Sequence, residues 1–320
     1  MTTKMAARLE RMGEERYKGL TKDGRWTGEV RVPPVHEAIE KVRRIPRRRD
    51  GKPRKVFVQS MADILHDDVP LSWLARVIVE MGKQSHVRWQ MLTKRAHRWP
   101  KVAEAVCNAR SVYGERWSWP SNVWVGVSVE NQQAADERIP HLLKVPAAVR
   151  FLSCEPLLGP VDLESLEISM DGLPGCLNAL TGVWWPACGD ADEERRERRW
   201  WAHGTRVEPG REEPTDGVSW VIAGCESGPG ARPMHPGWAR SLRDQCAEAG
   251  VAFHFKQWGQ HAPAERPIGD GWVAYTDGGE PWGFGTLEKG RTHVFMPRMS
   301  KEGAGRELDG RTHDAFPEGE

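Results

Sequence analysis

Charged and polar side chains follow the short apolar segments of this sequence, at the point where each segment ends. Four of these segments are each followed by a carboxylate, namely Asp63, Glu130, Glu155 and Glu226. Carboxylates that converge on one pocket can transfer protons or pair with cationic groups of a ligand. We predict a catalytic set of Asp63, Glu130 and Glu155.

Hydroxyl, amide and carboxylate side chains occur at the same segment ends and could line a pocket that binds a cofactor. The predicted cofactor-binding set is Ser60, Thr93, Ser128, Asn131, Ser153, Glu226 and Ser227. Any one of them could instead cap a helix or join a salt bridge at the rim of a sheet. Glu226 and Lys256 are not capping residues, which favours a pocket.

The glycine-rich stretch 224–230 could hold an anion with its backbone amides, although it matches neither a P-loop nor a dinucleotide fingerprint.

A basic run lies between residues 43 and 55, with eight basic residues and one acid. It is typical of a solvated loop before a strand, or of a surface that binds phosphates of nucleic acid. The second interpretation predicts contacts through Arg43, Arg44, Arg47, Arg48, Arg49, Lys52, Arg54 and Lys55. The whole chain has a formal charge of +1, so no global field attracts nucleic acid.

Metal and nucleophile motifs are weak in this sequence. Cys176 and Cys188 are not spaced as a C-x-x-C pair, and we interpret them as ordinary thiols. Neither a G-x-S-x-G elbow nor an H-E-x-x-H motif is present. Six scattered cysteines, a charged N-terminus and no apolar run of membrane-span length predict a cytoplasmic protein.

The elements that would position these residues alternate between strands and helices. Strands are predicted at 55–60, 87–93, 122–129, 148–154, 218–224 and 251–257, and helices at 70–82, 131–143 and 236–250. The strands lack clean alternation, which favours burial of both faces by helices. Strand–helix units predict an α/β protein with a parallel sheet, either a barrel or a doubly wound sheet. We expect a domain at 1–260 with an insertion at about 164–216, followed by an irregular, Gly-rich extension at 261–320.

Several long motifs resemble an uncharacterised phage and prophage family. They are VFVQSMADILHDDVP (56–70), QMLTKRAHRW (90–99), NVWVGVSVENQQAADERIPHLL (122–143), RFLSCEPLLGPVDL (150–163), VIAGCESGPGARPMHPGWARSLRDQC (221–246), FKQWG (255–259) and GRELDGRTHDAFP (305–317). Members of that family look like radical S-adenosylmethionine enzymes and are often encoded beside three-Cys-motif partner proteins. The resemblance implies a partial (β/α) barrel that binds S-adenosylmethionine and a [4Fe–4S] cluster.

The sequence departs from this family at its beginning. The family has a first strand and three clustered cysteines there, whereas no cysteine precedes Cys107 in this chain. We therefore expect a truncated, radical-SAM-like protein without cluster ligands, and a late start codon or an interrupted gene. Two alternatives are a non-catalytic module that binds nucleic acid or a phage protein, and a cluster-independent enzyme that uses Glu130 and Glu155 for acid–base chemistry.

Overall fold

The structure is a computed structural model that describes most of the chain. The described residues are 2–14, 17–23, 25–58, 62–111, 118–170, 173–186, 216–228, 230–264, 272–276, 281–282 and 293–317. The chain forms two compact units, the first made of residues 1–91 and 101–123 and the second of 92–100 and 124–320. No helix in the described ranges is long and apolar enough to cross a membrane.

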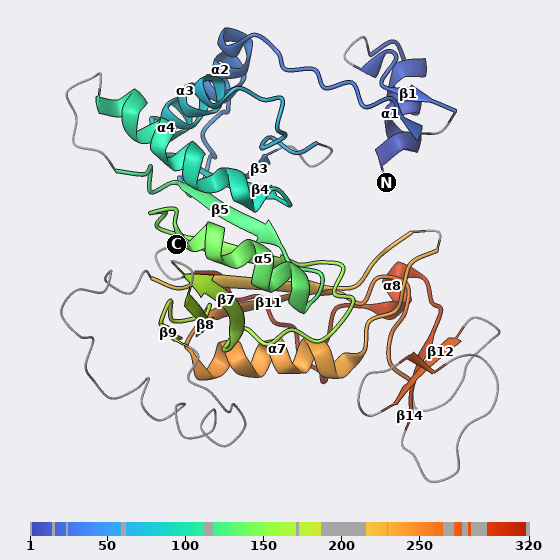
Figure 1. Ribbon diagram of the computed structural model, residues 1–320. Coiled ribbons are helices and arrows are strands. Elements are labelled where there is room, and N and C mark those ends of the chain that lie inside the picture. The colour runs from blue at the N-terminus through green and yellow to red at the C-terminus, as the bar shows by residue number, and fades with distance from the viewer. Residues whose placement is uncertain are drawn as a thin grey trace. The chain divides into compact units, whose positions relative to one another are not determined.

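A six-stranded sheet has the strand order β11–β10–β6–β5–β4–β3 (Figure 1). Its strands are β3 (Arg54–Val58), β4 (Val87–Thr93), β5 (Val123–Ser128), β6 (Arg150–Cys154), β10 (Trp220–Gly224) and β11 (Ala252–Gln257). The pairings of β3 with β4, β5 with β6, β6 with β10 and β10 with β11 are parallel. The protein is therefore an α/β protein of the partial (β/α) barrel type, and the six predicted strands are confirmed.

The first unit holds β3 and most of β4 together with several helices. It contains α1 (Thr2–Arg11), β1 (Thr21–Lys22), β2 (Arg25–Trp26), α2 (Val35–Arg43), α3 (Leu71–Gly82) and most of α4 (Trp99–Ser111). The indole of Trp89 on β4 donates to the carbonyl of Met81 on α3 at 3.1 Å, so α3 covers the face of the strand that carries Trp89. The buried amide of Asn122 lies 3.0 Å from the Met81 and Gln84 carbonyl oxygens and 3.1 Å from that of Val87.

The strands β5 and β6 are buried on both faces, as the lack of alternation predicted. Every residue of β5 and β6 is buried. Helix α5 (Gln132–Leu143) follows β5, and α7 (Pro236–Glu248) lies along β10 and β11 (Figure 1). The side chains of Trp124, Phe151 and Trp220 form an aromatic cluster. A Cβ atom on Gly126 would lie 2.5 Å from the Phe151 ring, so only glycine fits at this position of β5.

Part of the predicted insertion forms a small antiparallel sheet. Its strands are β7 (Leu166–Met170), β8 (Leu173–Leu177) and β9 (Trp184–Pro186), and β7 contacts α5. Leu166, Leu177 and Ala179 are buried, and the Ala179 amide donates to the Leu163 carbonyl at 2.8 Å. Cys188 and residues 187–215 lie outside the described residues, and the predicted domain limits stay predictions.

The C-terminal part contains the strands β12 (Trp272–Thr276), β13 (Pro281–Trp282) and β14 (His293–Pro297), with helix α8 (Lys301–Ala304). Residues 305–317, which we call the C-terminal strap, then lie along β11. The Phe255 amide donates to the His313 carbonyl at 2.9 Å, and the Trp220 indole donates to the Ala315 carbonyl at 3.0 Å. The strap therefore occupies the β11 edge of the sheet.

Candidate functional site

A polar cavity of about 560 Å³ lies in the second unit, where β5, β6 and β10 end. Its lining residues are Lys94, Glu130, Asn131, Gln133, Ala134, Glu137, Arg138, Pro156, Leu158, Glu226 and Arg232. Carboxyl ends of parallel strands are where α/β proteins bind ligands, because the loops that follow the strands converge there. We call this cavity the carboxyl-edge cavity.

Glu130 is a largely buried carboxylate that two cationic side chains hold in the carboxyl-edge cavity. Its side chain is 12% exposed, and it accepts hydrogen bonds from Lys94 and, at 2.6 Å, from Nη1 of Arg138. Burial opposes ionisation, but the hydrogen bond from Lys94 and the charges of Lys94 and Arg138 outweigh it and lower the pKa of Glu130. A general acid near neutral pH needs a raised pKa. The arrangement therefore favours a structural and ligand-binding role for Glu130 over proton transfer.

One donor of the Arg138 side chain meets no acceptor among the described residues. Its Nη1 also donates to the Ser128 carbonyl at 2.8 Å, which fixes the guanidinium between β5 and α5. Its Nε–H is buried and meets no acceptor in the described part of the chain. A buried donor without an acceptor costs free energy. The Arg138 side chain therefore carries one unsatisfied donor beside the carboxyl-edge cavity.

The glycine-rich loop after β10 is closed by its own ion pair. Glu226 Oε2 accepts from the Arg232 amide at 3.1 Å and from Nε of Arg232 at 2.9 Å. The hydrogen bond and charge of Arg232 lower the pKa of Glu226, so this carboxylate is ionised at neutral pH. A Cβ on Gly259 would lie 2.1 Å from the Glu226 carbonyl oxygen, so glycine is required where the loop meets the end of β11.

The N-terminal turn of α5 supplies one wall of the carboxyl-edge cavity. Asn131 is the N-cap of α5, and its Oδ1 accepts from the Ala134 amide at 3.0 Å. Asn131, Ala134 and Arg138 are three and four residues apart, which places them on one face of the helix. This spacing is the signal that would have identified Arg138, which the sequence-based prediction omitted together with Gln133 and Glu137.

The structure brings together three of the predicted site residues, Glu130, Asn131 and Glu226. Glu155 does not line the carboxyl-edge cavity: it accepts from Nζ of Lys256 at 2.8 Å and packs over Gly224. Ser128 and Ser153 are buried neighbours on β5 and β6 and do not line it either.

The remaining predicted residues have local or separate places. Thr93 is buried and accepts from the Arg95 amide at 2.9 Å, as a turn residue does. Ser227 is exposed in the glycine-rich loop, and Ser60 lies outside the described residues. Asp63 belongs to the first unit, where its Oδ1 accepts from the Leu65 amide at 3.0 Å.

The described cysteines do not fit an iron–sulfur cluster. Within the described ranges, no group of three or more Cys, His, Asp or Glu side chains could hold a metal ion. Burial raises the pKa of Cys225 to about 11 and that of Cys246 to about 12, so both are neutral thiols. The described residues therefore do not form a ligand set for a cluster.

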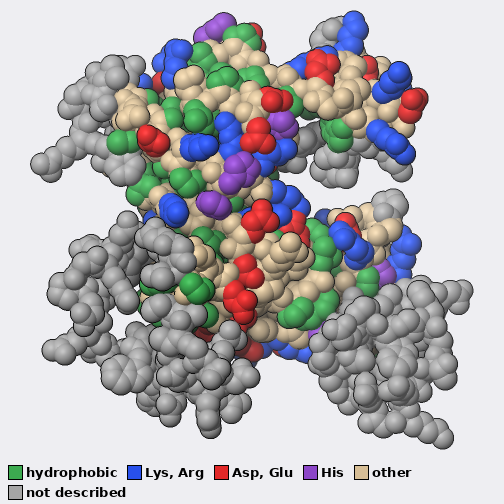
Figure 2. All heavy atoms as spheres, in the orientation of Figure 1, with side chains coloured by type: hydrophobic (Ala, Val, Ile, Leu, Met, Phe, Trp, Pro, Cys, Tyr) green, Lys and Arg blue, Asp and Glu red, His purple; other side chains and the backbone are tan. Residues whose placement is uncertain are grey.

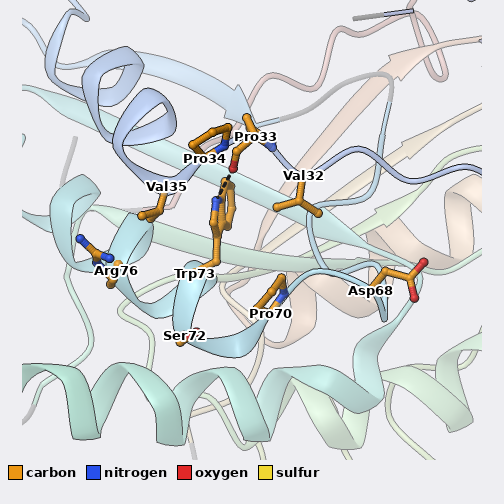
Figure 3. Close-up of a pocket in the computed structure, with 9 residues that line it drawn as sticks. All are labelled: Val32, Pro33, Pro34, Val35, Asp68, Pro70, Ser72, Trp73 and Arg76. Carbon is orange, nitrogen blue, oxygen red and sulfur yellow. Dashed lines mark hydrogen bonds between the residues drawn. The ribbon is translucent and has the colours of Figure 1, made fainter.

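A second cavity, of about 470 Å³, lies in the first unit (Figure 3). Prolines and valines form most of its wall around Trp73, whose indole donates to the Pro33 carbonyl at 2.8 Å. Asp68 and Arg76 lie on opposite sides of Trp73 and are its only charged lining residues. None of the predicted site residues lines this cavity, and its mostly apolar wall offers few groups for chemistry.

Comparison with known proteins identifies a family but no characterised relative. No curated protein and no solved structure matches this chain. The family of proteins of unknown function DUF5131 matches residues 1–317, which is nearly the whole sequence. The chain therefore belongs to the DUF5131 family.

Proposed function

We propose that this protein binds S-adenosylmethionine, or a closely related adenosyl amino acid, in the carboxyl-edge cavity of a radical-SAM-like barrel. The resemblance to radical-SAM-like phage proteins suggests the ligand, and the partial (β/α) barrel agrees with the fold that this resemblance implies. The phage origin and a three-Cys-motif partner stay predictions of the same resemblance. The proposal concerns binding, because the described residues offer no cluster ligands.

The observation that carries the proposal is the balance of charges in the carboxyl-edge cavity. Three cationic side chains face three carboxylates: Lys94, Arg138 and Arg232 against Glu130, Glu137 and Glu226. A ligand with both an ammonium and a carboxylate, such as an amino acid, finds a partner for each group there. A volume of about 560 Å³ lies within the roughly 300–1,000 Å³ of small-molecule sites.

The geometry assigns separate roles to the lining residues. Glu130 is held by Lys94 and Arg138, so it orients these cations, and the exposed Lys94 can pair with a ligand carboxylate. The Glu226 side chain is 33% exposed, which leaves it open to a ligand ammonium. The amides of Asn131 and Gln133 can bind ribose hydroxyls or the edge of adenine.

Isothermal titration calorimetry with S-adenosylmethionine, S-adenosylhomocysteine, adenosine and methionine tests the proposal. We expect the two adenosyl amino acids to bind more tightly than either fragment. Glu226→Gln should weaken the adenosyl amino acids about tenfold, because a charge-assisted hydrogen bond contributes roughly 1.5–3 kcal/mol. Glu40→Gln is the matched control, since Glu40 pairs with Arg44 outside the cavity.

The proposal fails if none of the four ligands binds at millimolar concentration. It also fails if Glu226→Gln and Glu40→Gln bind the adenosyl amino acids as the wild type does. Thermal melts of each variant establish that a loss of binding does not come from unfolding.

A further inference from the structure

Charges of both signs are mixed on the face of the molecule that Figure 2 shows, so a nucleic-acid surface has to be found locally. Figure 2 shows Lys and Arg interspersed with Asp and Glu on the face in view, in keeping with the net charge of +1. The basic run at 43–55 is the densest local excess of positive charge in the sequence. The ion pairs that these residues form in the structure decide how many of the positive charges remain available to bind phosphates.

Three of the eight cations in the basic run form ion pairs with carboxylates of described residues. Arg43 pairs with the buried Glu80 at 2.7 Å, Arg44 with Glu40 at 2.9 Å and Arg48 with Asp50 at 2.6 Å. Arg47 and Arg49 are exposed, and neither makes a hydrogen bond or ion pair with any described residue. Lys52 is exposed as well.

The loop that carries these cations is held in one conformation at both ends. The Ile45 carbonyl lies 2.9 Å from Nε2 of His86, and Nε of Arg54 donates to the Pro46 carbonyl at 3.1 Å. At the tip of the loop, Asp50 accepts from the Lys52 amide at 3.1 Å. The cations are therefore presented from a pre-formed loop, which lowers the entropy that binding costs.

The loop leads directly into β3. The face of β3 that lies opposite α3 carries further positive charge and an aromatic ring. Lys55 pairs in register with Arg88, and Phe57 pairs with Gln90, so these four side chains share one face of β3 and β4. Helix α3 covers the opposite face, through Trp89. Phe57 is 45% exposed, which makes it one of four exposed large hydrophobic side chains among the described residues.

We propose that one surface of the first unit binds single-stranded nucleic acid. This surface consists of the 43–55 loop and of the face of β3 and β4 that lies opposite α3. Phe57 stacks on a base, and Arg47, Arg49, Lys52, Lys55 and Arg88 contact phosphates. An aromatic side chain on an open sheet face beside cations is the arrangement with which proteins bind single strands, because every base has a π-face and every nucleotide a phosphate.

Fluorescence anisotropy with a fluorescein-labelled 20-nucleotide oligo(dT) or oligo(U) tests this inference at several salt concentrations. We expect binding at low salt and a steep loss as salt rises. The triple variant Arg47→Gln/Arg49→Gln/Lys52→Gln should reduce the slope of log K against log salt by about 2. Each phosphate contact with a single strand contributes about 0.7 to this slope, and the variant removes three such contacts. Lys101→Gln/Lys144→Gln/Lys301→Gln removes three exposed cations elsewhere and should leave the slope nearly unchanged.

A second set of variants tests whether Phe57 stacks on a base. Phe57→Ala should weaken single-strand binding about tenfold with an unchanged salt slope, and Phe57→Trp should restore it. Met12→Ala is the control, because Met12 is 67% exposed outside this face.

Three outcomes would overturn the proposal. One is equal loss of affinity in the two triple variants. Another is binding of phosphatidylserine vesicles with no binding of the oligonucleotides. The third is equal affinity for a 20-base-pair duplex together with no effect of Phe57→Ala. Glu226→Gln should leave oligonucleotide binding intact, so this test is independent of the carboxyl-edge cavity.

Discussion

At the scale of single residues, the pair Glu130–Arg138 organises the candidate site. Its two charges are only 12% and 16% exposed as side chains. Removing one partner from a largely buried pair leaves an uncompensated charge, and this costs more than the pair contributes in net stability.

Arg138→Met should therefore lower the free energy of unfolding by about 3 kcal/mol. The double variant Glu130→Gln/Arg138→Met should recover part of that loss, because it also removes the buried carboxylate, which Arg138→Met leaves with Lys94 as its remaining cationic partner. Urea denaturation measures both. Arg44→Gln, which breaks an exposed pair, should cost less than about 1 kcal/mol. Equal losses for Arg138→Met and Arg44→Gln would contradict the role assigned to Arg138.

At the scale of elements, the N-cap of α5 positions one wall of the carboxyl-edge cavity. Asn131→Ala removes the hydrogen bond to the Ala134 amide and should cost about 1 kcal/mol of stability. Asn131→Asp keeps a hydrogen-bond acceptor at this position and should retain nearly all of the wild-type stability. Thermal or chemical denaturation distinguishes the two variants, and identical losses would show that capping is not the role of this side chain.

The C-terminal strap is joined to α7 by charges. Asp309 accepts from Nε of Arg240 at 2.9 Å and from Nη1 of Arg243 at 2.6 Å. The hydrogen bond from Arg240, followed by that from Arg243, outweighs desolvation and lowers the pKa of Asp309 to about 2. Because the folded pKa lies below the unfolded value of about 3.9, this contribution to stability is present above pH 4 and is lost as pH falls toward 2.

Asp309→Asn should consequently melt at a lower temperature than the wild type at pH 5. The difference between the two melting temperatures should shrink as pH falls from about 4 to 2. Melting curves across this range measure it. A difference that stays constant with pH would show that the ionised Asp309 does not stabilise the strap.

At the scale of the whole molecule, the strap connects the chain's C-terminal part to the core of the second unit. The Phe316 ring lies 4.8 Å from that of Trp220 and 5.8 Å from that of His254, measured between centroids. This contact completes the aromatic cluster of Trp124, Phe151 and Trp220.

Phe316→Ala should lower the free energy of unfolding by about 2–3 kcal/mol, because it removes a partly buried ring from a packed cluster. Phe316→Leu should cost less, since it keeps most of the apolar volume. The measurement is denaturant unfolding followed by tryptophan fluorescence. If Phe316→Ala is as stable as the wild type, the strap does not contribute to the core.

Local sequence patterns predicted the elements of this protein but not its side-chain pairs. Apolar runs, prolines and glycines placed the six strands and the helices α3, α5 and α7 within a few residues, because these signals act over one or two turns of chain. Positions at strand ends likewise indicated Glu130, Asn131 and Glu226 as neighbours, because parallel strands bring their carboxyl ends together.

Tertiary structure alone decided which charges meet and which surfaces stay open. Lys94 reaches Glu130 across 36 residues and Lys256 reaches Glu155 across 101, and both pairs depend on the strand order of the sheet. The same order leaves Phe57 exposed on β3 although the sequence around it reads as a buried strand. Hydrophobic periodicity is a local property, whereas burial and ion pairing depend on which distant segments become neighbours when the sheet assembles.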